Sequence, residues 1–320
     1  MVKLKSLLLI TICALAVYGF WLSVQDLEVL VAGLDALGVP VLMGLLGLSL
    51  VNYGVRYARW TWLLGLPASA ACDSRNLYAY IAGFALVTTP VKAGELIRCR
   101  YYKALLHIDH DRIVATLLTE RVLDILSGLL IASLALSVLA SLQMAIWLSL
   151  GIVALVFLTT RYPWVCLGIA RWLSDRSPFE GASRLYTFVE STFETLTAQL
   201  TASRLLPGTL MGVVSWSAEA IGFAWLVILL GSDASFLMLM GIFAISLIAG
   251  AVSFLPGGLG GAEAAMYLLL TGSGLDAGSA TIAVVITRLC TLWFAVLLGV
   301  VSALTLERTL AVESEQQRVF

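Results

Sequence analysis

Charged side chains inside long apolar runs are the residues of this chain best placed to do chemistry. Glu120, Arg121 and Asp124 lie close together in one run, Glu219 lies in a second and Arg288 in a third. An ionisable residue in a membrane span costs about 2.5–3.5 kcal/mol on insertion scales. Arginines bind phosphate well, so these residues predict a polar cavity for an anionic group, with the carboxylates as counter-ions or proton carriers. The alternative is an internal salt bridge that only locks helices together, which would need fewer charges.

A second pattern is an order of residues that occurs twice. In each half, a turn rich in Pro and Gly is followed by a Glu and, at nearly the same spacing, by an Arg in the next apolar run. Glu95 and Arg121 form the first set, and Glu263 and Arg288 form the second. The pattern predicts an internal repeat. Chance is the alternative explanation in so Gly-rich a chain.

The two turns indicate broken helices. Backbone inside a bilayer must be hydrogen-bonded internally or border a cavity, so a Pro/Gly break marks a place where a ligand can approach. Gly allows backbones to come close, and free N–H groups at a helix start attract anions. A tight helix–helix turn without a ligand is the alternative. The predicted substrate-binding and transport residues are Lys92, Glu95, Glu120, Arg121, Asp124, Pro256, Gly257, Gly258, Gly260, Gly261, Glu263 and Arg288.

Composition identifies the elements that must position these residues. Of the 320 residues, 60% are hydrophobic and only 12% are charged, which excludes an ordinary soluble protein. A helix needs about 20 apolar residues to span a bilayer. The predicted full spans are 4–22, 39–58, 113–139, 143–160, 208–230 and 280–305. We expect the first of them to be an uncleaved helix, with a cleaved signal peptide as the alternative.

Two further apolar segments are too short or too broken to be simple spans. Residues 76–107 and 236–272 each turn back at Pro and Gly, which predicts two re-entrant hairpins. Their tips should approach each other near mid-membrane and share one cavity. Added bulk at these tips should therefore impair transport more than added bulk at Gly44 or Gly299, which lie in the predicted spans.

The expected fold is an all-α polytopic membrane protein. It has six full spans and two Pro/Gly-broken re-entrant hairpins, arranged as an inverted repeat within one membrane domain. The predicted parts are a first repeat at 1–140, a second repeat at 141–310 that includes a cytoplasmic or interfacial segment at 161–206, and a cytoplasmic tail at 311–320.

The positive charges predict the orientation. Most of the 19 Lys and Arg residues fall in segments that share one side of the predicted spans. Because such segments face the cytoplasm, both termini should be cytoplasmic and the membrane a bacterial inner membrane. Arg56 and Arg59 are assigned to one of these cytoplasmic segments. Arg98, Arg100 and Lys103 are interpreted as lipid head-group contacts at the interface, with simple anchoring as the alternative.

The polar segment 161–206 is too short for an enzyme domain. Val189, Phe193, Leu196 and Leu200 recur in it at helical spacing, which predicts a helix on the membrane surface. The sequence shows no P-loop and no metal-ligand spacing among its five cysteines, and its two histidines are expected in a solvated turn. We therefore expect no catalytic activity, no metal, no cofactor and no nucleic-acid partner.

Four stretches resemble the lysylphosphatidylglycerol synthase transmembrane-region family, a flippase-like membrane domain. They are TPVKAGELIRCRYYK at 89–103, LLTERVLDIL at 117–126, FLPGGLGGAEAAMYLLL at 254–270 and TRLCTLWFAVLLG at 287–299. In fused members of the family, this region is thought to move an aminoacylated phospholipid that a separate soluble domain makes. The resemblance implies a stand-alone inner-membrane member without the synthase domain. Other relatives are linked to hopanoid or polyprenyl-phosphate glycolipid pathways, so the resemblance does not identify the lipid.

The predicted function is translocation of an anionic lipid or lipid-linked phosphate between bilayer leaflets. One alternative is an accessory subunit that holds a lipid-modifying enzyme or glycosyltransferase at the membrane, and a lipid-biosynthesis enzyme would then be its partner. A less favoured alternative is an intramembrane enzyme that uses the charges of the third span. Two mirrored broken helices favour transport, because an accessory subunit does not need them. The lipid, the direction, the energy source and the oligomeric state stay open.

Overall fold

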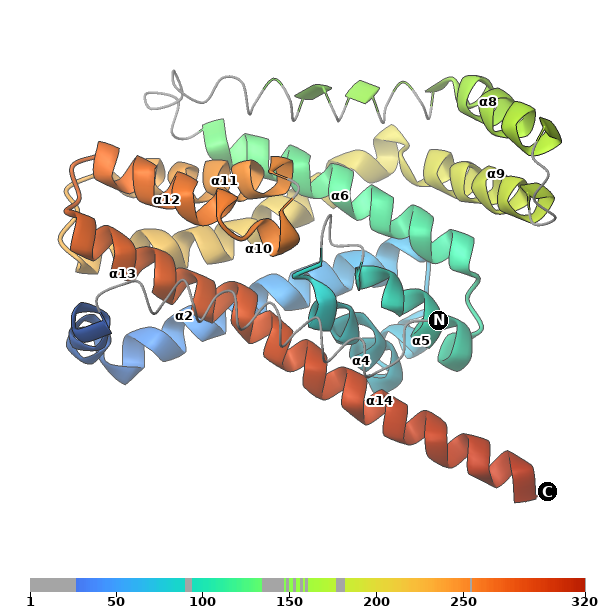
Figure 1. The fold of residues 1–320 in the computed structure, drawn as a ribbon, viewed down its shortest axis with the longest axis horizontal. Helices are drawn as coiled ribbons and strands as arrows, with labels where there is room; N and C mark the ends of the chain where they lie inside the picture. The colour runs from blue at the N-terminus through green and yellow to red at the C-terminus, as the bar shows by residue number, and fades with distance from the viewer. Residues whose placement is uncertain are drawn as a thin grey trace.

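The computed structural model describes residues 27–89, 94–133, 161–176, 182–253 and 255–319, together with isolated positions between 147 and 158. Within these ranges the chain forms helices and no strand, which confirms the all-α class. Long helices run along the longest axis of the molecule (Figure 1). The elements are α2 (Leu27–Leu63), α3 (Ala68–Ala71), α4 (Ser74–Ala82), the 3-10 turn η1 (Gly83–Leu86), α5 (Ile97–Leu106), α6 (His110–Ala132), α8 (Pro163–Arg176), α9 (Ala182–Gln199), α10 (Ala202–Leu229), α11 (Phe236–Val252), the 3-10 turn η5 (Pro256–Gly258), α12 (Gly261–Gly272), α13 (Ala277–Arg288), the π-helical turn η6 (Leu289–Trp293) and α14 (Phe294–Val319).

Within the part of the chain that the structure describes, three helical segments are long and apolar enough to cross a membrane, so the chain is a membrane-embedded protein. They are Leu37–Leu63, Ser203–Leu229 and Ala277–Ala311, which match the predicted spans 39–58, 208–230 and 280–305. Helix α6 covers most of the predicted span 113–139 and carries its charged residues. The predicted span 4–22 and most of 143–160 lie outside the described residues.

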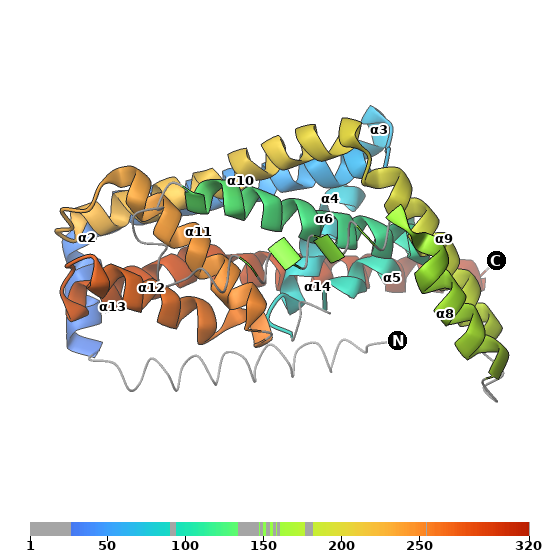
Figure 2. The ribbon, with the colours of Figure 1, turned by 90° about the horizontal axis from the view of Figure 1, so that it is seen from above.

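The long helices α2 and α10 pack against each other and run in opposite directions (Figures 1 and 2). Helix α2 bends where Gly38 has a non-helical backbone and Pro40 lacks an N–H group, so its straight part begins near the predicted start of the span. Small residues allow the close contact of the two helices. A Cβ atom on Gly44 would lie 2.7 Å from the ring of Trp225 in α10.

Two helical hairpins enter the molecule from its opposite ends (Figure 1). In the first hairpin, α4 and η1 lead to a turn and α5 returns along α4. In the second, α11 leads to η5 and α12 returns along α11. The two tips touch, because a Cβ atom on Gly257 would lie 3.2 Å from the Cα atom of Thr88.

The first arm of each hairpin packs on a long helix from the other half of the chain. Helix α14 lies against α4 and η1, while α6 lies against α11. Gly299 is the point of closest approach, since a Cβ atom there would lie 2.1 Å from the backbone nitrogen of Ala85. Gly299 and Gly44, which the sequence places in ordinary spans, therefore both lie at close helix contacts, and the weaker effect of bulk there on transport stays a prediction.

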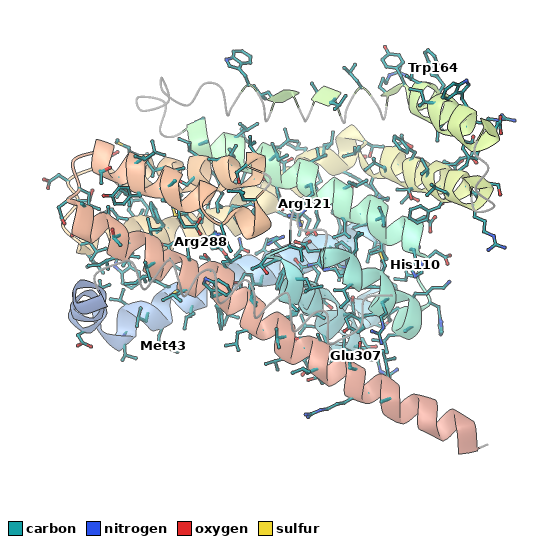
Figure 3. The ribbon with its side chains drawn as sticks, viewed as in Figure 1. Met43, His110, Arg121, Trp164, Arg288 and Glu307 are labelled. Atoms are coloured by element: carbon teal, nitrogen blue, oxygen red, sulfur yellow. The ribbon has the colours of Figure 1, made fainter. Side chains whose placement is uncertain are left out.

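The helix predicted within 161–206 corresponds to α9, and its position on the membrane surface stays a prediction. Its apolar face lies against α6, and Leu196 on that face is buried. This face is therefore covered by protein. Helix α8 packs on α9 and keeps Trp164 exposed (Figure 3). Trp172 of the same helix is also exposed.

Candidate functional site

A cavity of about 300 Å³ lies where the hairpin tips meet the long helices. Its wall is mostly apolar, with charged groups from α2, α6, α10 and α13. Arg121 on α6 and Arg288 on α13 both reach the interior, on helices that run in opposite directions (Figure 3). The polar and aromatic residues of the wall include Tyr53, Arg56, Phe84, Arg121, Asp124, Trp216, Glu219, Arg288 and Thr291.

In the second hairpin, Glu263 and Arg288 form a tight buried pair. The Arg288 Nε atom donates to Glu263 Oε1 at 2.6 Å, and Arg288 Nη2 donates to the carbonyl of Gly257 at 3.0 Å. The other carboxylate oxygen, Glu263 Oε2, accepts the backbone N–H of Gly260 at 2.8 Å. One carboxylate therefore caps the start of α12, holds the turn and neutralises the arginine.

The first hairpin has the same pairing. Arg121 Nη2 donates to Glu95 Oε2 at 2.9 Å, just as Arg288 donates to Glu263. This pair is more open, because the Arg121 side chain is 28% exposed and that of Arg288 only 5%. The order of residues that occurs twice in the sequence thus corresponds to two similar ion pairs in space.

The glycines of the second tip are required by its backbone. Gly257, Gly258 and Gly260 have φ angles of 64°, 68° and 90°, a region that L side chains rarely adopt. Space is also short. A Cβ atom on Gly258 would lie 3.2 Å from the backbone of Gly250, and one on Gly261 would lie 2.7 Å from Ser253 Oγ.

At one wall of the cavity, a largely buried network joins four arginines to three carboxylates, and Arg56, Arg121 and Asp124 of this network line the cavity. Arg59 pairs with Asp124 at 2.5 Å and with Glu120 at 3.5 Å. Arg98 pairs with Glu120 at 3.2 Å and approaches Glu95 at 3.6 Å. The network continues to Arg121, which lies 3.5 Å from Asp124, and to Arg56, which lies 3.8 Å from it. Buried charges of both signs compensate each other here, which lowers the cost of placing them in an apolar bundle.

Two of these arginines were not expected inside the protein. Arg56 and Arg59 are assigned to a cytoplasmic segment by sequence, yet both are buried within the apolar segment Leu37–Leu63. The sequence after these two arginines could have shown that they lie inside the span. Trp60, Trp62 and Leu63 continue the apolar run, so the two arginines do not mark its end.

The interfacial role predicted for Arg98 is also wrong. Its side chain is fully buried, and its Nε atom donates to the carbonyl of Tyr80 at 3.0 Å. Its guanidinium lies 4.8 Å from the ring centroid of Trp60 and 4.2 Å from that of Tyr80. Gly83 leaves the room for it, because a Cβ atom there would lie 2.3 Å from Arg98 Nε.

The other two predicted head-group contacts lie at the surface and have protein partners. Arg100 pairs with Glu307 of α14 at 2.8 Å, and Lys103 pairs with Asp109 at 2.6 Å. The hydrogen bond and charge of Lys103 lower the pKa of Asp109. Neither cation contributes to the cavity wall.

A comparison with protein families matches residues 5–299 to the family described as lysylphosphatidylglycerol synthase TM region. The chain belongs to this family. The match confirms the resemblance seen in the four sequence stretches, and it places the chain among membrane domains associated with lipid-related functions. A search of curated proteins found no match.

In this member of the lysylphosphatidylglycerol synthase TM-region family, the predicted site residues fall into two groups. The first group lines the cavity and consists of Arg121, Asp124, Gly257, Gly258 and Arg288. The second lies behind the wall or at the hairpin turn and consists of Glu95, Glu120, Pro256, Gly260, Gly261 and Glu263. Lys92 lies outside the described residues. Sequence reasoning missed Arg56 on α2 and Trp216 on α10, because both come from elements distant from the turns.

Proposed function

We propose that this protein moves an anionic lipid between the leaflets of a bacterial inner membrane, without catalysing a reaction. One observation carries the proposal. A single cavity is lined by both hairpins and by arginines from both halves of the chain, Arg121 and Arg288. Membership of a family of membrane domains associated with lipid-related functions supports a lipid as the ligand.

The proposed route depends on the difference between the charged groups of the cavity and its mostly apolar wall. The charged groups inside the cavity suit an anionic head group, while its mostly apolar wall suits the first part of a lipid tail. Leu255, at the edge of the second tip, lines the cavity and is exposed at the protein surface. The tails would leave the cavity past this edge and stay in the bilayer while the head group crosses.

The proposed motion follows from the two opposed hairpins. If both are re-entrant, the first opens the cavity toward the cytoplasm and the second toward the periplasm, with both termini cytoplasmic. In the described structure, the pair Glu263–Arg288 is sealed and the pair Glu95–Arg121 is partly exposed. This difference fits a state in which the first hairpin is the looser gate.

The test is lipid movement in vesicles that contain the purified full-length chain. A fluorescent phosphatidylglycerol in both leaflets is bleached from outside by a membrane-impermeant reductant, and vesicles without protein serve as the control. The protein should raise the bleached fraction above about half, because inner-leaflet lipid becomes accessible. An uncharged fluorescent diacylglycerol should respond equally in both kinds of vesicle. If the anionic lipid also shows no difference, translocation is wrong and the accessory-subunit alternative becomes the better proposal.

A further inference from the structure

Arg56 differs from the other arginines that line the cavity. Arg121 and Arg288 each have a carboxylate oxygen within 2.9 Å, whereas the nearest carboxylate oxygen to Arg56 is Asp124 Oδ2 at 3.8 Å. The Arg56 side chain is only 7% exposed. Its Nε and Nη2 atoms are buried and form no hydrogen bond with any described residue. A buried guanidinium in this condition is costly unless a further group binds it.

Asp124 cannot fully compensate Arg56. Asp124 Oδ1 accepts hydrogen bonds from Arg59 Nη2 at 2.5 Å and from Trp216 Nε1 at 3.1 Å. The other oxygen lies 3.5 Å from Arg121 and 3.8 Å from Arg56. The Asp124 carboxylate is therefore shared by three guanidinium groups, and that of Arg56 lies farthest from it.

The two free atoms of Arg56 form a pair suited to an oxyanion. The N–H bonds of Nε and Nη2 lie side by side on one edge of a guanidinium and can donate together to two oxygens of one phosphate or carboxylate. In Arg288 this edge is already used, because Nε donates to Glu263 and Nη2 to Gly257. Among the arginines of the cavity wall, Arg56 is the one with this edge free of hydrogen bonds to described residues.

Aromatic rings hold the Arg56 guanidinium in place. Its Cζ atom lies 5.7 Å from the ring centroid of Phe84 in the first hairpin and 5.2 Å from that of Trp216 in α10. Cation–π contacts of this kind fix the position of an arginine without occupying its N–H donors. The group is thus held at the wall while Nε and Nη2 form no hydrogen bond with a described residue.

We propose that Arg56 binds the phosphate of the transported head group through Nε and Nη2, while Arg121 and Arg288 hold the hairpins. This inference rests on the proposed lipid transport and assigns its anion-binding residue. The ligand chemistry is a phosphate oxyanion, and a phosphodiester lipid and free phosphate both present it. The cavity's apolar wall favours the lipid.

Binding measurements on the full-length protein in detergent test this inference. Dihexanoylphosphatidylglycerol and inorganic phosphate are titrated separately by calorimetry into the wild type, Arg56→Gln, Arg56→Lys and the control Arg184→Gln. Arg184 is an exposed residue of α9. We expect Arg56→Gln to bind the lipid about 10- to 100-fold more weakly, because it loses two charge-assisted hydrogen bonds. Arg56→Lys should fall between, since it keeps the charge without the paired donors, and Arg184→Gln should bind like the wild type.

Each outcome bears on one of the two proposals. Unchanged lipid binding by a monodisperse Arg56→Gln variant would overturn the role of Arg56 and leave lipid translocation untouched. Wild-type vesicles without translocation, combined with lipid binding that depends on Arg56, would overturn the transport and keep the binding site. If inorganic phosphate binds as tightly as the lipid, the lipid assignment is wrong. If both Arg56 variants aggregate while Arg184→Gln does not, Arg56 is a fold element and the inference fails.

Discussion

At the scale of single residues, the two Glu–Arg pairs explain how a polar turn can persist in an apolar protein. Glu263 accepts a backbone N–H from the turn with one oxygen and binds Arg288 with the other. Arg288 in turn donates to the carbonyl of Gly257. The buried groups of the turn therefore satisfy one another, which is the condition for irregular backbone away from water.

The effects on stability of removing Glu263 and of removing Arg288 should not be additive, because each side chain is the partner of the other. We expect Arg288→Gln or Glu263→Gln alone to destabilise the protein by about 3–5 kcal/mol, because a buried charge loses its partner. The double variant should be less destabilised than the sum of the single ones. Thermal unfolding in detergent measures this, with Arg184→Gln expected within about 0.5 kcal/mol of the wild type. Strict additivity would show that the two side chains do not act as a pair.

Sequence reasoning could find these pairs but not the network behind them. The pairs Glu95–Arg121 and Glu263–Arg288 join residues at nearly equal spacing, so a repeated pattern along the chain is enough to suggest them. Arg59 instead finds its partners on α6, which is remote in sequence. The sequence-based prediction ends the second span at 58, before Arg59. An arginine with no carboxylate nearby in the sequence is typical of the boundary of a membrane span. Tertiary contact alone reveals the compensating carboxylates.

At the scale of elements, each hairpin depends on a long helix from the other half. Helix α14 supports α4 and η1, and α6 supports α11. Hydrophobic length and Pro/Gly breaks predicted the two hairpin segments, because both signals are local in the sequence. The packing of each hairpin on a helix from the other half involves residues far apart in the sequence, so no local signal predicts it. The sequence around Gly299 is that of an ordinary apolar span. Only the contact with Ala85 shows why residue 299 must be small.

Gly299 provides the test of this support. A methyl group there would lie 2.1 Å from the backbone nitrogen of Ala85, so Gly299→Ala should destabilise the protein by about 1–3 kcal/mol or more. Gly54 of α2 is the matched control, because no atom lies within 4 Å of a Cβ atom built there. Gly54→Ala should be neutral or slightly stabilising, since Ala favours helix. Equal melting temperatures of the two variants in detergent would contradict the close contact of α14 with η1.

At the scale of the whole molecule, the halves run in opposite directions and meet at one cavity. The pair α2 and α10 and the pair α6 and α13–α14 are each antiparallel along the long axis (Figures 1 and 2). The hairpins enter from opposite ends, and their tips touch at Gly257 and Thr88. Under the proposed function, such an arrangement would give each side of a membrane its own gate to a common site. Asp124 from the first half and Arg288 from the second both line this site, so the proposed motion of one half against the other would change what the cavity exposes.

Because the two hairpins enter from opposite ends of the molecule, we expect their outer ends to face opposite sides of the membrane. Ala104 lies near the end of α5 in the first hairpin, and Ala277 begins α13 just after the second; both are exposed. Cysteines at these positions leave the Lys103–Asp109 pair and the cap of α13 by Asp276 intact. In a background without native cysteines, a membrane-impermeant maleimide should label Ala277→Cys in intact spheroplasts. It should label Ala104→Cys only after permeabilisation, because the positive charges near it favour the cytoplasm. Labelling of both from the same side would exclude opposed hairpins, and with them a cavity that opens to each side in turn.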